Sequence, residues 1–266
     1  MKAGIHIALV GNPNSGKSSL FNALTGARQK IANYPGVTVE RKSGRTALPD
    51  GRPVELLDLP GAYSLQPDSL DEAVTRDVVL GKFAGQRRPD ALVIVVDAGN
   101  LDNHLRFAIE LIGQGLPVVI ALNMVDLAER DGLEIDPSVL ADELGVPVVS
   151  TVAVRKRGLE RLLSMLSEVL SQSRPDEVDA PENRKQITDR AHRIAKRAII
   201  SETQGRQWTK RLDAILLHPV GGVAILLALL FVMFQAVYGW SEAPIGWIEA
   251  GFSALTGAIN GQMSDG

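Results

Sequence analysis

Eight residues near the start of the chain have the types and the spacing of a phosphate-binding loop. They run from Gly11 to Ser18 and fit the pattern G-x-x-x-x-G-K-[ST]. Glycines let the backbone curl until successive N–H groups surround an anion, with the positive end of a helix behind them. In such a loop Lys17 contacts the β- and γ-phosphates of a nucleoside triphosphate, and the Ser18 hydroxyl holds Mg²⁺. The residues expected to contact the nucleotide here are Gly11, Asn12, Pro13, Asn14, Ser15, Gly16, Lys17, Ser18 and Ser19.

A second pattern follows the apolar run that ends at Leu57. Asp58-Leu59-Pro60-Gly61 fits D-x-x-G, in which Asp58 would hold Mg²⁺ through a water molecule and the Gly61 N–H would meet the γ-phosphate. Leu59 and Pro60 lie between these groups and are expected beside the nucleotide. Two motifs in this order favour a nucleotide-hydrolysing switch protein.

A third pattern selects the base. Asn123-Met124-Val125-Asp126 fits N-x-x-D and follows another buried run. The Asp126 carboxylate accepts two hydrogen bonds from the N1–H and N2 amine of guanine, whereas adenine has no such donor pair and would leave it unpaired. Asn123 is expected to tie this loop to the phosphate loop, with Met124 beside the nucleotide. The sequence therefore predicts GTP and GDP as ligands.

A weaker fourth signal lies at Ser150-Thr151-Val152, before Ala153. Backbone N–H groups of this segment are expected to touch the guanine O6. Many GTPases have Ser-Ala here, so Ser150 matches and Thr151 departs, which leaves the affinity and release rate of the nucleotide open.

Residues 29–40 are polar, contain glycine and are expected to form a mobile loop. Gly36, Val37 and Thr38 in this loop are expected beside the phosphates. The Thr38 hydroxyl would join Mg²⁺ only when a γ-phosphate is present. A plainer interpretation, that Thr38 opens the strand that follows, is compatible with this role.

The sequence lacks a glutamine that commonly takes part in GTP hydrolysis. Small signalling GTPases carry a glutamine after D-x-x-G, but Ala62 occupies that position here and cannot orient a water molecule. We hypothesise that the Asn14 amide oxygen coordinates K⁺ beside the β- and γ-phosphates and so supplies positive charge. The expected catalytic groups are Lys17, Thr38, Gly61 and Asn14, and intrinsic turnover is expected to be slow.

These motifs require strands that end at the site and helices that begin there. Strands are expected near 5–10, 38–46, 53–58, 91–97, 117–122 and 146–150, and helices near 17–25, 70–83, 101–113, 136–144 and 157–172. The alternation predicts an α/β fold, a Ras-like P-loop G domain with a mostly parallel sheet, over residues 1–172. Residues 173–212 are predicted to contain an acidic, Pro-bearing linker and a small helical domain built on a basic amphipathic helix over 184–204.

Residues 213–266 are predicted to begin a membrane domain. Residues 220–240 contain no charged side chain and one amide, Gln235, which suits a transmembrane helix. Lys210 and Arg211 precede this run, so the positive-inside tendency places the G domain in the cytoplasm. A buried helix of a soluble domain is the alternative. Residues 241–266 are expected to lie along the outer membrane surface.

Composition narrows the function further. The formal net charge of −3 argues against broad electrostatic binding to nucleic acid. The chain has no cysteine, which excludes thiolate metal sites within it. Its four histidines are scattered in sequence and are expected to be surface or packing residues. No signal peptide is expected, because no apolar region before a cleavage site follows Lys2.

Together these motifs resemble the cytoplasmic half of the ferrous iron transport protein B (FeoB) family. The resemblance rests on GNPNSGKSSLFNALTG, NYPGVTVERKSG, DLPGAYSL, VVDAGNLDNHL and ALNMVDLA, and on the segment from KRLDAILLHPVGG to VYGW. It implies K⁺-stimulated GTP hydrolysis with Mg²⁺, a helical domain that slows GDP release, and a permease that moves Fe²⁺ across the bacterial inner membrane. It also implies homo-oligomers and small accessory Feo proteins as partners. Family members continue through more membrane segments, so the Fe²⁺ path is expected outside this chain, and no nucleic acid is expected.

Two other functions remain open on the sequence alone. A soluble assembly or RNA-modification GTPase would have the same motifs but no membrane span. A nucleotide-gated binding switch with negligible turnover is compatible with Ala62.

Overall fold

Runs of branched aliphatic residues form the central strands, because such runs suit strands that helices cover on both faces. The computed structural model describes residues 4–26, 29–34, 37–172, 183–202, 212, 215–238, 246, 248 and 250–253. They belong to two units, Met1–Thr203 and Gln204–Gly266. The strands are β1 (Ile5–Gly11), β2 (Gln29–Asn33), β3 (Glu40–Ala47), β4 (Pro53–Asp58), β5 (Ala91–Asp97), β6 (Val118–Asn123), β7 (Leu133–Ile135), β8 (Val148–Ser150) and β9 (Ile199–Glu202). The helices of the first unit are α1 (Lys17–Thr25), α2 (Leu70–Val79), α3 (Leu101–Ile112), α4 (Val125–Arg130), α5 (Pro137–Leu144), α6 (Leu159–Ser171) and α7 (Arg184–Ala198).

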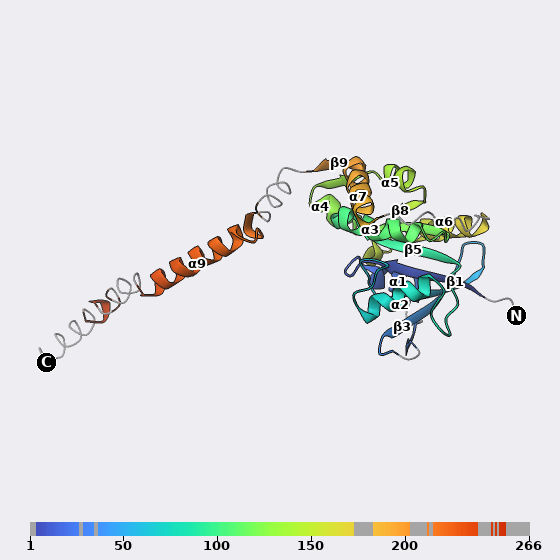
Figure 1. Cartoon of the computed structure of the whole chain (residues 1–266), viewed down its shortest axis with the longest axis horizontal. Coiled ribbons are helices and arrows are strands. Elements are labelled where there is room, and N and C mark those ends of the chain that lie inside the picture. Colours follow the sequence, from blue (N-terminus) through green and yellow to red (C-terminus); the bar gives the residue numbers. More distant parts are fainter. Residues whose placement is uncertain are drawn as a thin grey trace, which may run out of the picture. The chain divides into compact units, whose positions relative to one another are not determined.

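Seven strands form one sheet in the order β2-β3-β4-β1-β5-β6-β8 (Figure 1). The strands from β4 to β8 are parallel, while β3 pairs antiparallel with both β4 and β2. The registers place Leu9 beside Asp58, Gly11 beside Val95 and Asp97 beside Asn123. The carboxyl ends of the strands that precede the motifs therefore meet at one edge of the sheet. This confirms the expected α/β fold with a mostly parallel sheet.

Alternate residues of the central strands β1, β4, β5 and β6 enter two separate hydrophobic cores. In β1, Ile7 and Leu9 pack with α1 and α6, whereas Ala8 and Val10 pack on the opposite face with α2 and α3. Ile94 on β5 belongs to the same core as Ala8 and Val10. Because these strands are packed on both faces, their ends are held in place, and the loops of the site begin at those ends.

The expected loop over 29–40 is wrong in its first half. Residues 29–33 form β2, an edge strand that pairs with β3 from Gln29↔Gly44 to Asn33↔Glu40. Its described side chains are exposed, Ile31 among them. An edge strand exposed on both faces has no hydrophobic alternation, so its sequence carries no strand signal.

The basic helix expected over 184–204 also ends early. Helix α7 stops at Ala198, and the chain continues as β9, which pairs antiparallel with β7. Ile199 and Ile200 are β-branched and favour the extended conformation. The apolar face of α7 joins the core that contains α3 and α5, within the first unit. The division into a G domain and a helical domain stays a prediction. Of the linker expected over 173–183, residues 173–182 lie outside the described residues, and Asn183 is the N-cap of α7.

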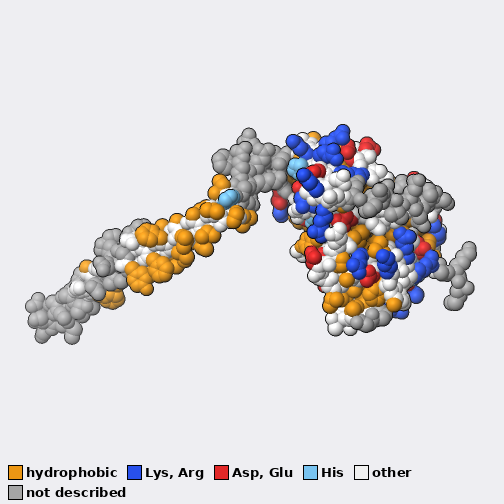
Figure 2. Space-filling view, in the orientation of Figure 1, with side chains coloured by type: hydrophobic (Ala, Val, Ile, Leu, Met, Phe, Trp, Pro, Cys, Tyr) orange, Lys and Arg blue, Asp and Glu red, His pale blue; other side chains and the backbone are white. Residues whose placement is uncertain are grey.

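The second unit contains α9 (Gly221–Tyr238), an 18-residue helix with a mean hydropathy of 2.2. By length and composition it is the one helix in the described part of the chain that is apolar enough to cross a membrane. None of its residues is buried within the molecule, and hydrophobic side chains cover it in Figure 2. Lys210, Arg211 and Trp240, which flank the predicted span, are outside the described residues.

Candidate functional site

The phosphate loop joins β1 to α1 through two left-handed residues. Asn14 has φ of 65° and Gly16 has φ of 80°. A Cβ atom on Gly16 would lie 2.3 Å from Nδ2 of Asn123, so only glycine fits this position. No side chain caps the start of α1, and no acidic residue occupies its first turn. Its free N–H groups and positive dipole are therefore available to an anion.

Three of the residues predicted to hold phosphate and Mg²⁺ already contact one another. Lys17 Nζ forms a buried ion pair with Oδ1 of Asp58, and the Ser18 hydroxyl donates to Oδ2 of Asp58 at 3.2 Å. Hydroxyl and carboxylate oxygens at this spacing are the hard ligands that Mg²⁺ prefers. The residues present thus fit a magnesium ion beside a phosphate.

The same residues line a polar cavity of about 380 Å³ with Thr38. Its other charged lining residues, which the sequence motifs did not identify, are Glu40, Lys42 and Asp71. The Thr38 side chain is exposed, and the structure shows no hydrogen bond from it to Asp58 or Ser18. The structure thus brings Thr38 to the rim of the site predicted to bind Mg²⁺.

Tyr34 anchors the loop that carries Thr38. Its ring is buried and meets Phe83 edge to face, with centroids 5.2 Å apart. Its N–H donates to the Val39 carbonyl at 2.9 Å, and its carbonyl accepts from Val37 N–H at 3.2 Å. Burial raises the pKa of the Tyr34 hydroxyl well above its usual range. Gly36, also predicted to contact nucleotide, lies outside the described residues.

The D-x-x-G segment packs directly against the phosphate loop. The Leu59 N–H donates to the Leu9 carbonyl at 3.1 Å, and the Ala62 N–H donates to the Gly11 carbonyl at 3.3 Å. A Cβ atom on Gly61 would lie 3.0 Å from Pro13. The Ala62 methyl group is fully buried, so this position presents no side chain to a water molecule at the phosphates.

Two carboxylates that sequence motifs did not identify hold the next loop, residues 63–69. Glu72 of α2 accepts hydrogen bonds from the N–H groups of Tyr63 and Asp68, at 3.0 and 2.9 Å. Glu110 of α3 accepts from Leu65 N–H at 2.6 Å and from the Ser64 hydroxyl. A signal for Glu72 was present, because Ser69-Leu70-Asp71-Glu72 fits a helix capping box and Ser69 does cap α2. Glu110 had no local signal.

Asn123 connects the base loop to the phosphate loop. Its Nδ2 donates to the Ser15 carbonyl at 3.1 Å, and its Oδ1 accepts from Ala153 N–H at 3.1 Å and from the Thr151 hydroxyl at 3.3 Å. The side chain is buried, with 1% of its surface exposed. One amide therefore joins three segments that are far apart in sequence.

Asp126 lies in the first turn of α4, a short helix that the sequence analysis missed. The left-handed Met124, with φ of 60°, precedes this helix. The Asp126 side chain is 16% exposed, and its Oδ2 is 3.7 Å from Nε of the exposed Arg155. The carboxylate is thus desolvated enough for an unpaired state to be costly, yet it remains accessible.

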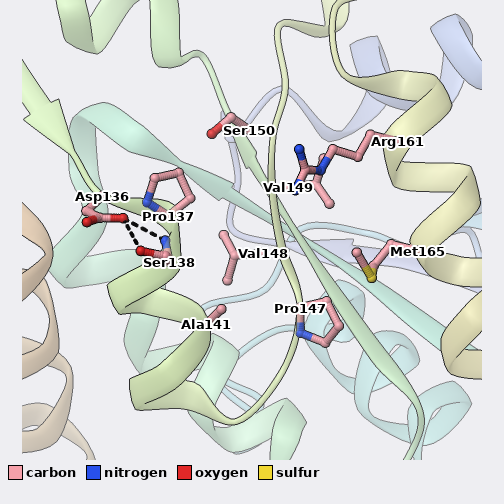
Figure 3. A pocket seen from close by; sticks show the side chains of 10 residues that line it. All are labelled: Asp136, Pro137, Ser138, Ala141, Pro147, Val148, Val149, Ser150, Arg161 and Met165. Carbon is pink, nitrogen blue, oxygen red and sulfur yellow. Dashed lines mark hydrogen bonds between the residues drawn. The ribbon is translucent and has the colours of Figure 1, made fainter.

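The 150–153 segment makes its contacts beyond Ser150. Thr151 is buried and donates its N–H to the Leu122 carbonyl at 2.8 Å, and Val152 pairs with Arg157. Ser150 instead lines a groove of about 530 Å³ between α5 and α6 (Figure 3). The contact with Asn123 comes from Thr151 and Ala153, so Thr151, which departs from the usual pattern, has a structural role.

His104 supports the same edge of the sheet from within α3. Its Nδ1 accepts the Asp97 N–H at 3.1 Å, and burial lowers its pKa. The folded state therefore favours the neutral ring. In the unfolded chain the ring has a pKa of about 6.5.

This lowered pKa predicts a pH-dependent free energy of unfolding. The stabilisation is complete above about pH 6.5 and is lost as pH falls from there through the lower pKa of the folded state, because the unfolded chain then binds more protons. Urea denaturation in detergent, followed by circular dichroism between about pH 7 and pH 5, should show a steeper loss for the wild type than for His104→Gln. Equal slopes for the two proteins would contradict this assignment.

Comparisons with known proteins identify the family to which these features correspond. Residues 5–166 match the model of the family described as ferrous iron transport protein B. The Fe(2+) transporter FeoB of Campylobacter jejuni subsp. jejuni serotype O:2 is 35% identical over 269 residues, which cover 98% of this chain and 43% of that protein. This chain therefore spans less than half the length of that relative.

Solved structures of the same family share the fold. The cytosolic domain of T. maritima FeoB in its GMPPNP form is 29% identical with a TM-score of 0.65, over 73% of this chain and 99% of that one. A point mutant of S. thermophilus NFeoB bound to GDP is 44% identical with a TM-score of 0.56, over 62% of this chain and 61% of that one.

Proposed function

This chain belongs to the ferrous iron transport protein B family, and we propose that it is the GTP-binding and GTP-hydrolysing cytoplasmic region of a ferrous iron transporter. The observation that carries the proposal is the cluster of Lys17, Ser18 and Asp58 at the start of α1, joined to the base loop by Asn123. Relatives of this fold bind GDP and GMPPNP, which supports guanine nucleotide as the ligand.

Each half of the site has a defined task in this proposal. Lys17 would leave its ion pair with Asp58 and contact the β- and γ-phosphates instead. The uncapped N-terminus of α1 would stabilise the remaining negative charge of the phosphates. Ser18, Thr38 and Asp58 would hold Mg²⁺, which offsets the charge of the phosphate oxygens. Asp126 accepts the guanine N1–H and N2 amine, while Asn123 fixes the distance between base and phosphates. The Gly61 N–H contacts the γ-phosphate end.

Turnover is proposed to depend on a monovalent cation. Ala62 is buried and cannot position the attacking water, so intrinsic hydrolysis is slow and needs charge from another source. Asn14 is exposed on the phosphate loop, and its amide oxygen would hold K⁺. A binding switch with negligible turnover is the outcome if no cation accelerates the reaction.

Single-turnover GTP hydrolysis in K⁺ and in Na⁺ buffers tests this mechanism. We expect the wild type to be faster in K⁺ by about 100-fold, the effect of one oriented transition-state contact. Asn14→Gly should lose this difference, because glycine accepts the left-handed backbone and removes only the amide. Lys156→Gly, another exposed left-handed position, is the matched control and should keep it. Equal wild-type rates in both buffers would remove the cation from the mechanism.

We further propose that α9 crosses the bacterial inner membrane and holds the first unit in the cytoplasm. None of its 18 residues is buried within the molecule and none is charged, as a lipid-facing helix requires, and this favours the transporter over a soluble assembly or RNA-modification GTPase. Fe²⁺ is the cargo of the whole transporter, with homo-oligomers and small accessory Feo proteins as its partners. Fe²⁺ uptake by cells that express the whole transporter should fall with Lys17→Met. Unchanged uptake would separate nucleotide binding from transport.

A further inference from the structure

The exposed face of α7 carries positive charge that nearby acids do not neutralise. Its apolar residues are buried against α3 and α5, which leaves the charged side chains in solvent. Arg197 pairs with Glu143 at 2.5 Å, and the His192 ring lies 3.4 Å from Asp102. Four exposed side chains form no ion pair within the described part of the chain; we call them the α7 basic face: Arg184, Lys185, Arg193 and Lys196.

Basic residues are concentrated in one segment of the sequence. Residues 184–211 contain nine Lys and Arg residues and two Asp and Glu residues. The rest of the chain contains nineteen Lys and Arg residues and twenty-nine Asp and Glu residues. Asp189 is the one acidic residue of α7. Figure 2 shows Lys and Arg side chains gathered over the end of the first unit that α7 and β9 occupy in Figure 1. A basic surface on an otherwise acidic protein indicates an anionic partner.

The position of this charge in the chain indicates which partner. Eighteen residues separate Glu202 from Gly221, the first residue of α9, and they span at most about 60 Å. With α9 in a bilayer, the α7 basic face stays within reach of the headgroups at a high effective concentration. Anionic headgroups attract basic segments next to a membrane helix, and each Lys or Arg strengthens binding by about fivefold. Anionic lipid headgroups are thus the anions present at the highest local concentration near the α7 basic face.

We propose that the α7 basic face binds anionic phospholipid headgroups of the bilayer that α9 spans. The inference rests on the proposed membrane anchoring but on neither nucleotide nor iron. Headgroup contact would hold the first unit against the bilayer by electrostatic attraction, which salt screens. It would therefore be sensitive to the lipid composition of the membrane.

The absence of cysteine allows a direct test with a single thiol. Lys196→Cys carries an environment-sensitive dye, and the full chain is reconstituted in nanodiscs of phosphatidylcholine with or without phosphatidylglycerol. We expect a blue shift of the dye emission only with phosphatidylglycerol, and its loss at high salt. Adding Lys185→Gln and Arg193→Gln should reduce the shift by well over half, since about fivefold in binding is lost per residue. The matched control, Lys30→Gln with Lys82→Gln, removes the same amount of charge from exposed positions outside α7 and should leave the blue shift unchanged.

Two outcomes would overturn the proposal. One is the same emission in both lipid compositions, and the other is an equal loss of the shift in the control pair. A shift produced by added RNA but not by phosphatidylglycerol would replace the lipid with a nucleic acid. GTP binding is measured on the same nanodiscs, so failure of the nucleotide site and failure of lipid contact are seen separately.

Discussion

Asp126→Asn should change the base preference of the site from guanine to xanthine. In the proposed site the carboxylate would accept two charge-assisted hydrogen bonds from guanine, whereas asparagine would replace one acceptor with an amide donor that opposes the guanine N2 amine. Hydrogen bonds of this kind contribute about 1.5–3 kcal/mol each, so GTP affinity should fall by about 100-fold to 10,000-fold. Xanthine has a carbonyl oxygen at C2, which accepts from the new amide. Calorimetric titration with GTP and with xanthosine triphosphate, both with Mg²⁺, measures the exchange.

The structure predicts little change in folding from this substitution. Among the residues that the structure describes, Asp126 forms an ion pair with Arg155 alone. The Arg155 side chain is 73% exposed, and such pairs contribute little to the free energy of unfolding. Asp131→Asn, which breaks another exposed pair with Arg130, is the matched control and should bind GTP as the wild type does. Wild-type GTP affinity in Asp126→Asn would show that this carboxylate does not read the base.

Lys17→Met should abolish GTP binding and also destabilise the protein. The ammonium group would be lost from the phosphates, and the buried Asp58, with a side chain 4% exposed, would lose its cationic partner and keep only the hydrogen bond from Ser18. Breaking a buried ion pair from one side costs about 3–5 kcal/mol of stability. GTP affinity should fall by at least about 100-fold, since a charge-assisted contact to the phosphates disappears. Urea denaturation and calorimetric titration separate the two effects.

The double variant Lys17→Met/Asp58→Asn distinguishes folding from binding. Asparagine removes the stranded charge, so this protein should recover most of the lost stability while GTP binding stays absent. Lys82→Met alters an exposed lysine and should change neither property. If Lys17→Met unfolds at the wild-type urea concentration, the Lys17–Asp58 pair does not contribute to the fold.

The parts of the molecule that sequence predicted best depend on short-range chemistry. Gly16 must be glycine because its own φ angle is 80°, and this requirement appears in the motif itself. Buried strands such as β5 and β6 are continuous apolar runs, which few other structures produce. Motif and strand together therefore located the edge of the sheet at which the site lies.

Other parts depend on partners that are distant in sequence. Residues 29–33 become a strand because β3 offers them an open edge, and β9 ends the expected helix because β7 lies beside it. Glu110 reaches Leu65 across 45 positions of sequence, and no local pattern announces that contact. Tertiary context decided these elements, as it commonly does for edge strands and loop contacts.

The position of Asn123 makes the two halves of the site one cooperative unit. Its amide is shared by the backbone of Ser15, the hydroxyl of Thr151 and the backbone of Ala153, so a displacement of any one of these segments leaves buried polar groups unpaired. Order in the base loop and order in the phosphate loop are therefore gained or lost together. A nucleoside, which has no phosphate, would therefore order the phosphate loop as well as the base loop that it contacts.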